Sequence, residues 1–153
     1  RGAFTHTSYH DHEILAANLA GGQRSADDRN SIYAMFTDPP LAHVGLYEAD
    51  ALRLVEQGRR ISQAVHQMKD ISRAKEESET HGLIKLLIDE DTGLFLGATM
   101  MGIAADEIIH SISLVMACGG TWQSVREALP AHPTVTEFLP TIIDRRKALL
   151  ARE

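Results

Sequence analysis

The stretch HGLIKLLIDEDTGLFLGATMMG, residues 81–102, gives the strongest indication of the fold. Two apolar runs, at 81–89 and 93–102, flank the segment EDTG, whose composition is typical of a turn. The stretch therefore predicts a β-hairpin and, with it, an antiparallel sheet.

Other segments extend this pattern in both directions. SIYAMF at 31–36 predicts a strand that ends at Pro39 and Pro40, since neither proline can donate a hydrogen bond to a sheet. ISQAVHQMKD at 61–70 fits either a helix or a strand, and its β-branched residues favour the strand. SRAKEESET at 72–80 reads as a solvated connection. Helices are expected at 5–20, near 48–58, at 105–118, at 122–128, and from Val135 into the charged tail. The predicted class is α+β, an antiparallel β-sheet with helices packed on it.

Composition narrows the function classes. The chain has 153 residues, 44% of them hydrophobic, which is enough for a core of its own. Its net charge is −6 with both signs well mixed, so no nucleic-acid footprint is expected. No apolar run is long enough for a membrane helix, and the N-terminus does not read as a signal peptide. We expect a cytoplasmic protein and, since the first residue is not Met, a piece of a longer one.

The single cysteine and the scattered histidines give no clear site. Cys118 ends an apolar helix, where the dipole does not favour a thiolate, and is interpreted as a small buried residue. His6 and His10 are four residues apart with His12 nearby, but three or four supported ligands would be needed, so no metal is expected. The remaining histidines are interpreted as packing or interface residues: His43, His66, His81 and His110.

The segment AHPTVTEFLP, residues 131–140, is the best candidate for chemistry. Pro133 favours an extended His132, and the bond between them can be cis. If a helix begins at Thr134, the carboxylate of Glu137 can reach the imidazole of His132 and fix its tautomer, as general acid–base catalysis requires. A loop histidine beside a capping glutamate is the alternative, and the spacing alone favours it.

Three segments in order resemble the pyridine nucleotide-disulfide oxidoreductases, which include glutathione reductase, lipoamide dehydrogenase and mercuric reductase. They are FTDPPLAHVGLYEADA, then the hairpin and the helix after it, which together run from HGLIK to ACG, and finally HPTVTEFLPT. Together they lie within residues 31–141. FTHTSYHDHEILAANL resembles the helix that in this family follows an FAD contact.

The resemblance implies a domain arrangement. Residues 1–30 would be the end of an FAD-binding domain, and residues 31–153 the dimerisation domain. The family's FAD and NAD(P)H domains and its redox-active cysteine pair would lie upstream, since this chain has no phosphate-binding loop. We therefore expect no tightly bound cofactor and no activity from this chain alone.

The same resemblance assigns roles. His132 would act as acid–base in the partner subunit's flavin and disulfide site, with Glu137 orienting it. Thr5, His6, His132 and Pro133 would lie near the flavin. A homodimer is expected, with the apolar stripe of Ile108, Ile112 and Val115 in the interface. A disulfide or another small electron acceptor would be the substrate, in keeping with cell redox homeostasis. A mercuric-reductase-like metal-ion reductase and a standalone, non-catalytic dimerisation module are the alternatives.

Overall fold

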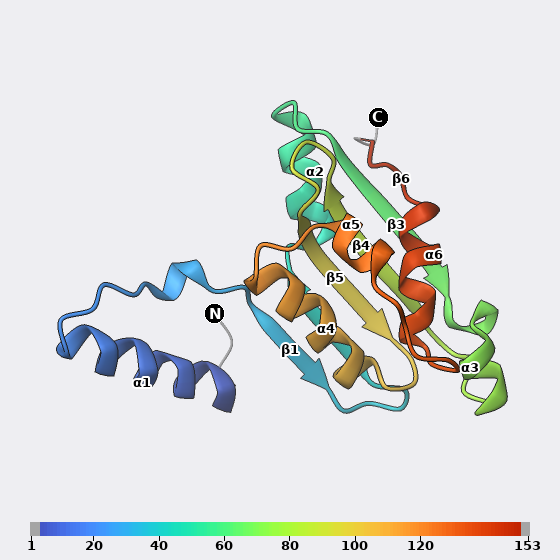
Figure 1. Cartoon of the computed structure of the whole chain (residues 1–153), viewed down its shortest axis with the longest axis horizontal. Helices are drawn as coiled ribbons and strands as arrows, with labels where there is room; N and C mark the ends of the chain where they lie inside the picture. The colour runs from blue at the N-terminus through green and yellow to red at the C-terminus, as the bar shows by residue number, and fades with distance from the viewer. Residues whose placement is uncertain (1–3, 151–153) are drawn as a thin grey trace.

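The computed structural model describes residues 4–150 and contains, within that range, a six-stranded antiparallel sheet in the order β1-β2-β5-β4-β3-β6 (Figure 1). The expected α+β class is confirmed. The strands are β1 Ile32–Met35, β2 Leu41–Gly45, β3 Ile61–Gln67, β4 Leu83–Asp89, β5 Phe95–Met101 and β6 Lys147–Ala148. The ambiguous segment at 61–70 is thus a strand that ends in a short 3-10 helix, η2 Met68–Asp70.

The predicted hairpin is formed by β4 and β5, paired from Leu83↔Met101 to Ile88↔Phe95. The side chain of Asp89 organises its turn, because Oδ1 accepts hydrogen bonds from the backbone amides of Asp91 and Thr92 at 2.8 and 3.2 Å. Asp89 is fully buried and is paired with Arg59. The buried carboxylate of Asp89, whose charge is balanced by Arg59, therefore stabilises the turn.

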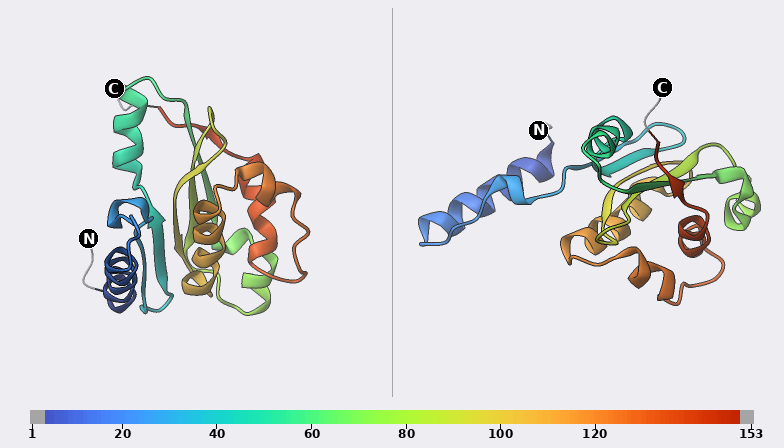
Figure 2. Two further views of the ribbon diagram at one scale, coloured as in Figure 1. Left: turned by 60° about the vertical axis from the view of Figure 1, so that its left-hand side comes forward. Right: turned by 90° about the horizontal axis from the view of Figure 1, so that it is seen from above.

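Helices cover the two faces of the sheet unequally (Figure 2). The helices α4, α5 and α6 lie on one face, and α2 lies on the other. The α-helices are α1 Thr5–Leu19, α2 Glu48–Glu56, α3 Ser72–Glu76, α4 Ala105–Ala117, α5 Trp122–Glu127 and α6 Leu139–Asp144; the other 3-10 helices are η1 Ala26–Asp28 and η3 Thr136–Phe138.

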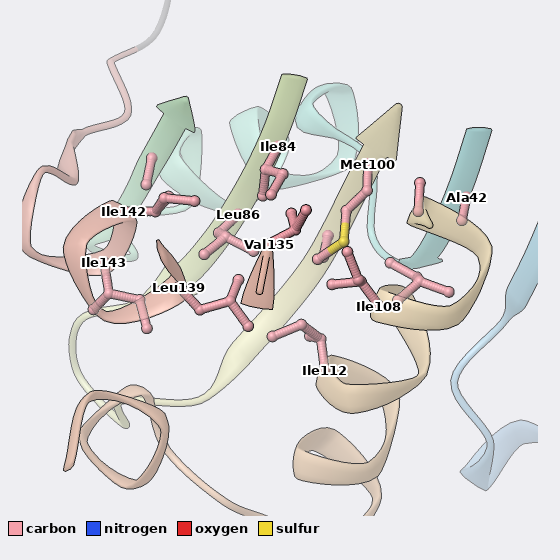
Figure 3. Packing of buried hydrophobic residues seen from close by; sticks show 14 of the residues in the cluster. Ala42, Ile84, Leu86, Met100, Ile108, Ile112, Val135, Leu139, Ile142 and Ile143 are labelled. Atoms are coloured by element: carbon pink, nitrogen blue, oxygen red, sulfur yellow. The ribbon is translucent and has the colours of Figure 1, made fainter. Parts of the chain in front are cut away.

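The main core lies between the sheet and α4 and α6 (Figure 3). Alternate residues of β4, Ile84 and Leu86, point into it, in the same cluster as Ile108 and Ile112 of α4. A smaller cluster on the other face packs α2 through Ala51 against Leu87. Helix α4 ends where expected, since Gly119 takes the left-handed conformation at φ 64°.

Two expectations for the secondary structure are wrong. The last helix does not run into the charged tail: α6 stops at Asp144, and the chain then pairs with β3 as β6. The segment 72–80 is not merely a solvated connection, because it begins with α3, which buries Ala74 completely. Helix α1 begins after Phe4, whose backbone is extended and which provides no side-chain cap.

Helix α1 and its linker extend from the edge of the sheet beside β1 (Figure 1). A cleft of about 610 Å³ lies between α1, the linker and the end of α4. Of the apolar side chains Ile14, Leu15 and Leu19 of α1, Ile14 is buried, whereas Leu15 and Leu19 are exposed. Among residues 4–150, no helix has the length and apolar character needed to cross a membrane.

Candidate functional site

The histidine of AHPTVTEFLP lies on the loop between α5 and η3, preceding a cis peptide bond to Pro133. Thr134 shapes the end of this loop. Its hydroxyl donates to the carbonyl of Ala131 at 2.8 Å and accepts from the amide of Glu137 at 3.1 Å. Val135 is buried in the core (Figure 3). The C-terminal half of the loop is therefore fixed by one polar cap and one apolar anchor.

His132 and Glu137 form the contact that their spacing suggests. Nδ1 of His132 donates to Oε2 of Glu137 at 2.8 Å, although Glu137 belongs to a 3-10 helix that begins at Thr136 rather than at Thr134. The His132 side chain is 77% exposed and the Glu137 side chain 14%. Because Nδ1 is hydrogen-bonded to Glu137, Nε2 is the ring nitrogen that would exchange a proton with another group, and the ring is exposed. This arrangement suits proton exchange with a group that approaches from outside the chain.

Thr5 and His6 form the first turn of α1, far along the chain from His132. Nε2 of His6 donates to the carbonyl of Ile32 at 2.8 Å, which ties this turn to β1. The ring of His6 also stacks on Phe4, with centroids 5.4 Å apart. The first turn of α1 contains no acidic residue, so nothing in it opposes the binding of a negative group at the helix N-terminus.

A column of aromatic rings, missed in the sequence, connects this turn to the sheet. Phe4 stacks on Tyr33, Tyr33 lies beside His43, and His43 stacks on Tyr47 with centroids 3.9 Å apart. The hydroxyl of Tyr47 donates to that of Tyr33 at 3.0 Å. This hydrogen bond is the main cause that raises the pKa of Tyr47 to about 12. The register Tyr33↔His43 across β1 and β2 was the signal that could have revealed the column.

His43 is buried and satisfied rather than free. Its Nε2 donates to the carbonyl of Gly45 at 3.0 Å, and its Nδ1 accepts from the hydroxyl of Thr99 at 2.9 Å. Burial lowers the pKa of His43, because the charged imidazolium would lose its hydration. The interpretation of His43 as a packing residue agrees with this environment.

The other histidines of α1 do not converge on a metal site. The two ring nitrogens of His10 each lie 3.3 Å from a guanidinium nitrogen, one of Arg24 and one of Arg29. Within residues 4–150, no group of three or more His, Cys, Asp or Glu side chains could hold a metal ion.

Two expectations for α4 are wrong. Cys118 is exposed, not buried. Of the stripe expected in the interface, Ile108 and Ile112 are buried against the sheet of the same chain, and the half-buried Val115 packs against the same core, so the stripe is not available to a partner. The outward side of α4 carries instead Glu107, His110, Ser111, Leu114 and Cys118, of which Leu114 is 54% exposed. One apolar stripe cannot face both its own core and a second subunit.

The sequence of this chain is similar to a known protein family and to several of its members. The family model described as pyridine nucleotide-disulphide oxidoreductase, dimerisation domain, matches residues 32–143. A relative from Escherichia coli, named probable pyridine nucleotide-disulfide oxidoreductase RclA, is 33% identical over 138 residues, which cover 89% of this chain and 31% of the relative. A dihydrolipoyl dehydrogenase from Synechocystis is 35% identical over 127 residues, covering 82% of this chain and 27% of the relative.

Solved structures agree. The HOCl-induced flavoprotein disulfide reductase RclA from Escherichia coli superposes with a TM-score of 0.83 at 32% identity, covering 93% of this chain and 32% of that one. Its complex with Cu(II) gives the same TM-score at 31% identity, covering 94% of this chain and 32% of that one. This chain therefore spans about a third of the length of the relatives that it matches.

Proposed function

Because this chain belongs to the pyridine nucleotide-disulfide oxidoreductases, as their dimerisation domain, we propose that it works within a homodimeric FAD- and NAD(P)H-dependent disulfide oxidoreductase. In this proposal residues 1–30 end the FAD-binding domain and residues 31–153 form the C-terminal dimerisation domain. The isolated chain would not oxidise NAD(P)H, since the cofactor-binding domains lie outside it.

The dimer would form through the outward side of α4 and the loop of His132. Leu114 is half-exposed on α4, and Leu129 is 98% exposed three residues before His132. Burying such apolar side chains between two copies would release water and stabilise the dimer. A twofold interface uses the same patch on both copies, so each loop would reach the other subunit.

His132 would act as the acid–base group for the partner's disulfide site, and this is the role that its contact with Glu137 supports best. A thiolate leaving a disulfide needs a proton, and the exposed Nε2 of His132 could supply it. Glu137 would hold the ring by Nδ1 and stabilise the imidazolium before the proton leaves. Pro133, next to His132, would set the path of the loop beside the flavin.

The chain also offers a place for the flavin that fits its charge. The first turn of α1, with Thr5 and His6, presents a helix N-terminus with no carboxylate in it. Such an end stabilises negative charge. Bound FAD would supply electron transfer from NAD(P)H to the disulfide, and this turn would contact it through the backbone.

The test is His132→Ala in the full-length protein, assayed with two electron acceptors. Reduction of a small disulfide should lose about 100-fold in kcat/KM, because general acid–base catalysis typically contributes that much or more. Reduction of a quinone, which takes electrons from the flavin without a leaving thiolate, should be unchanged. Equal disulfide activity in the variant and the wild type would exclude the acid–base role.

A second candidate is a reductase whose acceptor is a metal ion, since two similar solved structures are Cu(II) complexes. Within residues 4–150 no cluster of side chains suits a metal, so such an ion would bind in another part of the protein. NAD(P)H consumption with Cu(II), and none with disulfides, would favour this candidate. A colourless protein without flavin would instead indicate a standalone dimerisation module.

A further inference from the structure

The loop of His132 joins two short helices that are held very differently. Helix α6 buries Leu139, Ile142 and Ile143, whereas α5 has no fully buried residue. A helix of six residues is far below the length of about 12–15 residues at which isolated helices become even marginally stable. The position of α5 therefore depends on contacts that its side chains make with neighbouring elements.

The start of α5 is held in two ways. The amide of Trp122 donates to the carbonyl of Gly93 at 2.9 Å, and Trp122 and Val125 pack against the core. Arg146 adds side-chain contacts at the same place. Its guanidinium carbon lies 4.0 Å from the ring centroid of Trp122, the first residue of α5. The same group donates to Glu90 beside the hairpin turn at 2.6 and 3.4 Å, and to the carbonyl of Ile143 in α6 at 3.1 Å. Its side chain is 18% exposed, so solvent screens these contacts only in part. Arg146 thus joins α5, α6 and the turn after β4.

A second bridge supports α5 more weakly. Nε of Arg126 lies 3.0 and 2.9 Å from the two carboxylate oxygens of Asp144, but both side chains are about half exposed. Exposed ion pairs of this kind contribute little, because water competes for both partners. Arg146 is therefore the stronger of the two links.

These contacts bear on His132 through the loop. Val135 anchors the loop after His132, but Leu129 is 98% exposed and Ala131 is exposed, so α5 is the nearest packed element on the side before it. We propose that Arg146 is a positioning residue for His132: its stack on Trp122 adds to the contacts that hold α5 and thereby helps to set where the imidazole meets the partner's disulfide. This inference rests on the proposed function.

The experiment compares Arg146→Met with Arg73→Met in the full-length FAD-containing protein. Arg73 pairs with Glu76 and Glu77 at the exposed end of α3, so its variant controls for the loss of a guanidinium. Arg146→Met should lower kcat/KM for disulfide reduction about 10-fold, since small misplacements of catalytic groups are costly. Quinone reduction and flavin content should match wild type, and Arg73→Met should change neither.

The double variant His132→Ala/Arg146→Met separates positioning from general damage. If Arg146 acts through His132, the double variant loses no more disulfide activity than His132→Ala alone. A further multiplicative loss would overturn the inference.

Two milder variants keep the inference testable if Arg146→Met does not bind flavin. Arg146→Lys keeps the charge near Glu90 without the flat stack, and Trp122→Leu removes the ring. Each should lose disulfide activity selectively. Full disulfide activity in both, with His132→Ala impaired, would refute the role of Arg146, whereas an unimpaired His132→Ala would refute the proposed function instead.

Discussion

Nδ1 of His132 and Oε2 of Glu137 lie 2.8 Å apart, yet the imidazole is largely exposed and the carboxylate is largely covered. In this pair the carboxylate is fixed in place, whereas the imidazole is accessible for reaction. Glu137 is held in η3, whose own geometry is fixed by Thr134, while the ring presents Nε2 outward. A group that exchanges protons with an incoming partner needs both properties.

Glu137→Ala in the full-length protein should lower kcat/KM for disulfide reduction about 10-fold, less than His132→Ala. The ring would keep its proton-carrying nitrogens but lose the contact that fixes its tautomer. Glu127→Ala, an exposed carboxylate on α5, is the matched control. Steady-state kinetics in which the two variants behave alike would show that Glu137 does not assist His132 in the reaction.

Ile112→Ala and Leu114→Ala should impair different properties, monomer stability and dimerisation, although the residues are two positions apart on α4. Ile112 is fully buried in the core, so its truncation should lower the free energy of unfolding by about 2–5 kcal/mol. Leu114 faces outward, so Leu114→Ala should leave monomer stability nearly unchanged and weaken dimerisation. Urea unfolding and analytical ultracentrifugation check the two effects. A dimer insensitive to Leu114→Ala would move the interface away from this side of α4.

The parts of the fold that were predicted depend on local sequence. The β4–β5 hairpin has its turn residues between its own strands, and His132 and Glu137 are only five residues apart. Helix α4 has a regular apolar stripe and a terminal glycine. In each case, the residues that determine the structure lie close together in the sequence.

The parts that were missed depend on distant pairing. Strand β6 exists because Lys147 pairs with Gln63 of β3, and nothing within the tail itself indicates a strand. The aromatic column requires the β1–β2 register to bring Tyr33 beside His43. Cys118 was wrongly predicted to be buried because its helix is apolar overall. Exposure depends instead on which side of the helix a residue lies, and Cys118 lies four residues after the exposed Leu114, on the same side.

Glu90→Gln should destabilise the chain near neutral pH and matter less in acid. The hydrogen bond from Arg146 is the main cause that lowers the pKa of Glu90 from its ordinary 4.5. A lowered carboxyl pKa gives stability that is present above about pH 4.5 and lost as pH falls through the folded-state value. The difference in unfolding free energy between wild type and Glu90→Gln should therefore shrink between about pH 5 and pH 3.

Asp91→Asn is the control, because Asp91 lies in the same turn and its pKa is also lowered, by Arg60, but in open solvent. Its effect on unfolding should be smaller at every pH. A pH-independent difference for Glu90→Gln would mean that the ionised carboxylate does not stabilise this corner.

His43→Phe should make the stability of the chain less sensitive to mild acid. Burial lowers the pKa of His43 below its ordinary 6.5, against smaller raising effects from the Gly45 carbonyl and Asp50. The unfolded state therefore takes up a proton first, so stability is complete above about pH 6.5 and falls as pH drops through the folded-state value. Phenylalanine keeps a flat ring on Tyr47 but cannot take up a proton. The slope of unfolding free energy against pH should therefore be shallower in the variant below about pH 6.5, without vanishing, since burial also lowers the pKa of His66.

His110→Phe, at an exposed position of α4, supplies the comparison. Urea titrations at several pH values measure the slope, and a slope in His43→Phe as steep as in wild type would show that His43 is not the group that loses stability in acid.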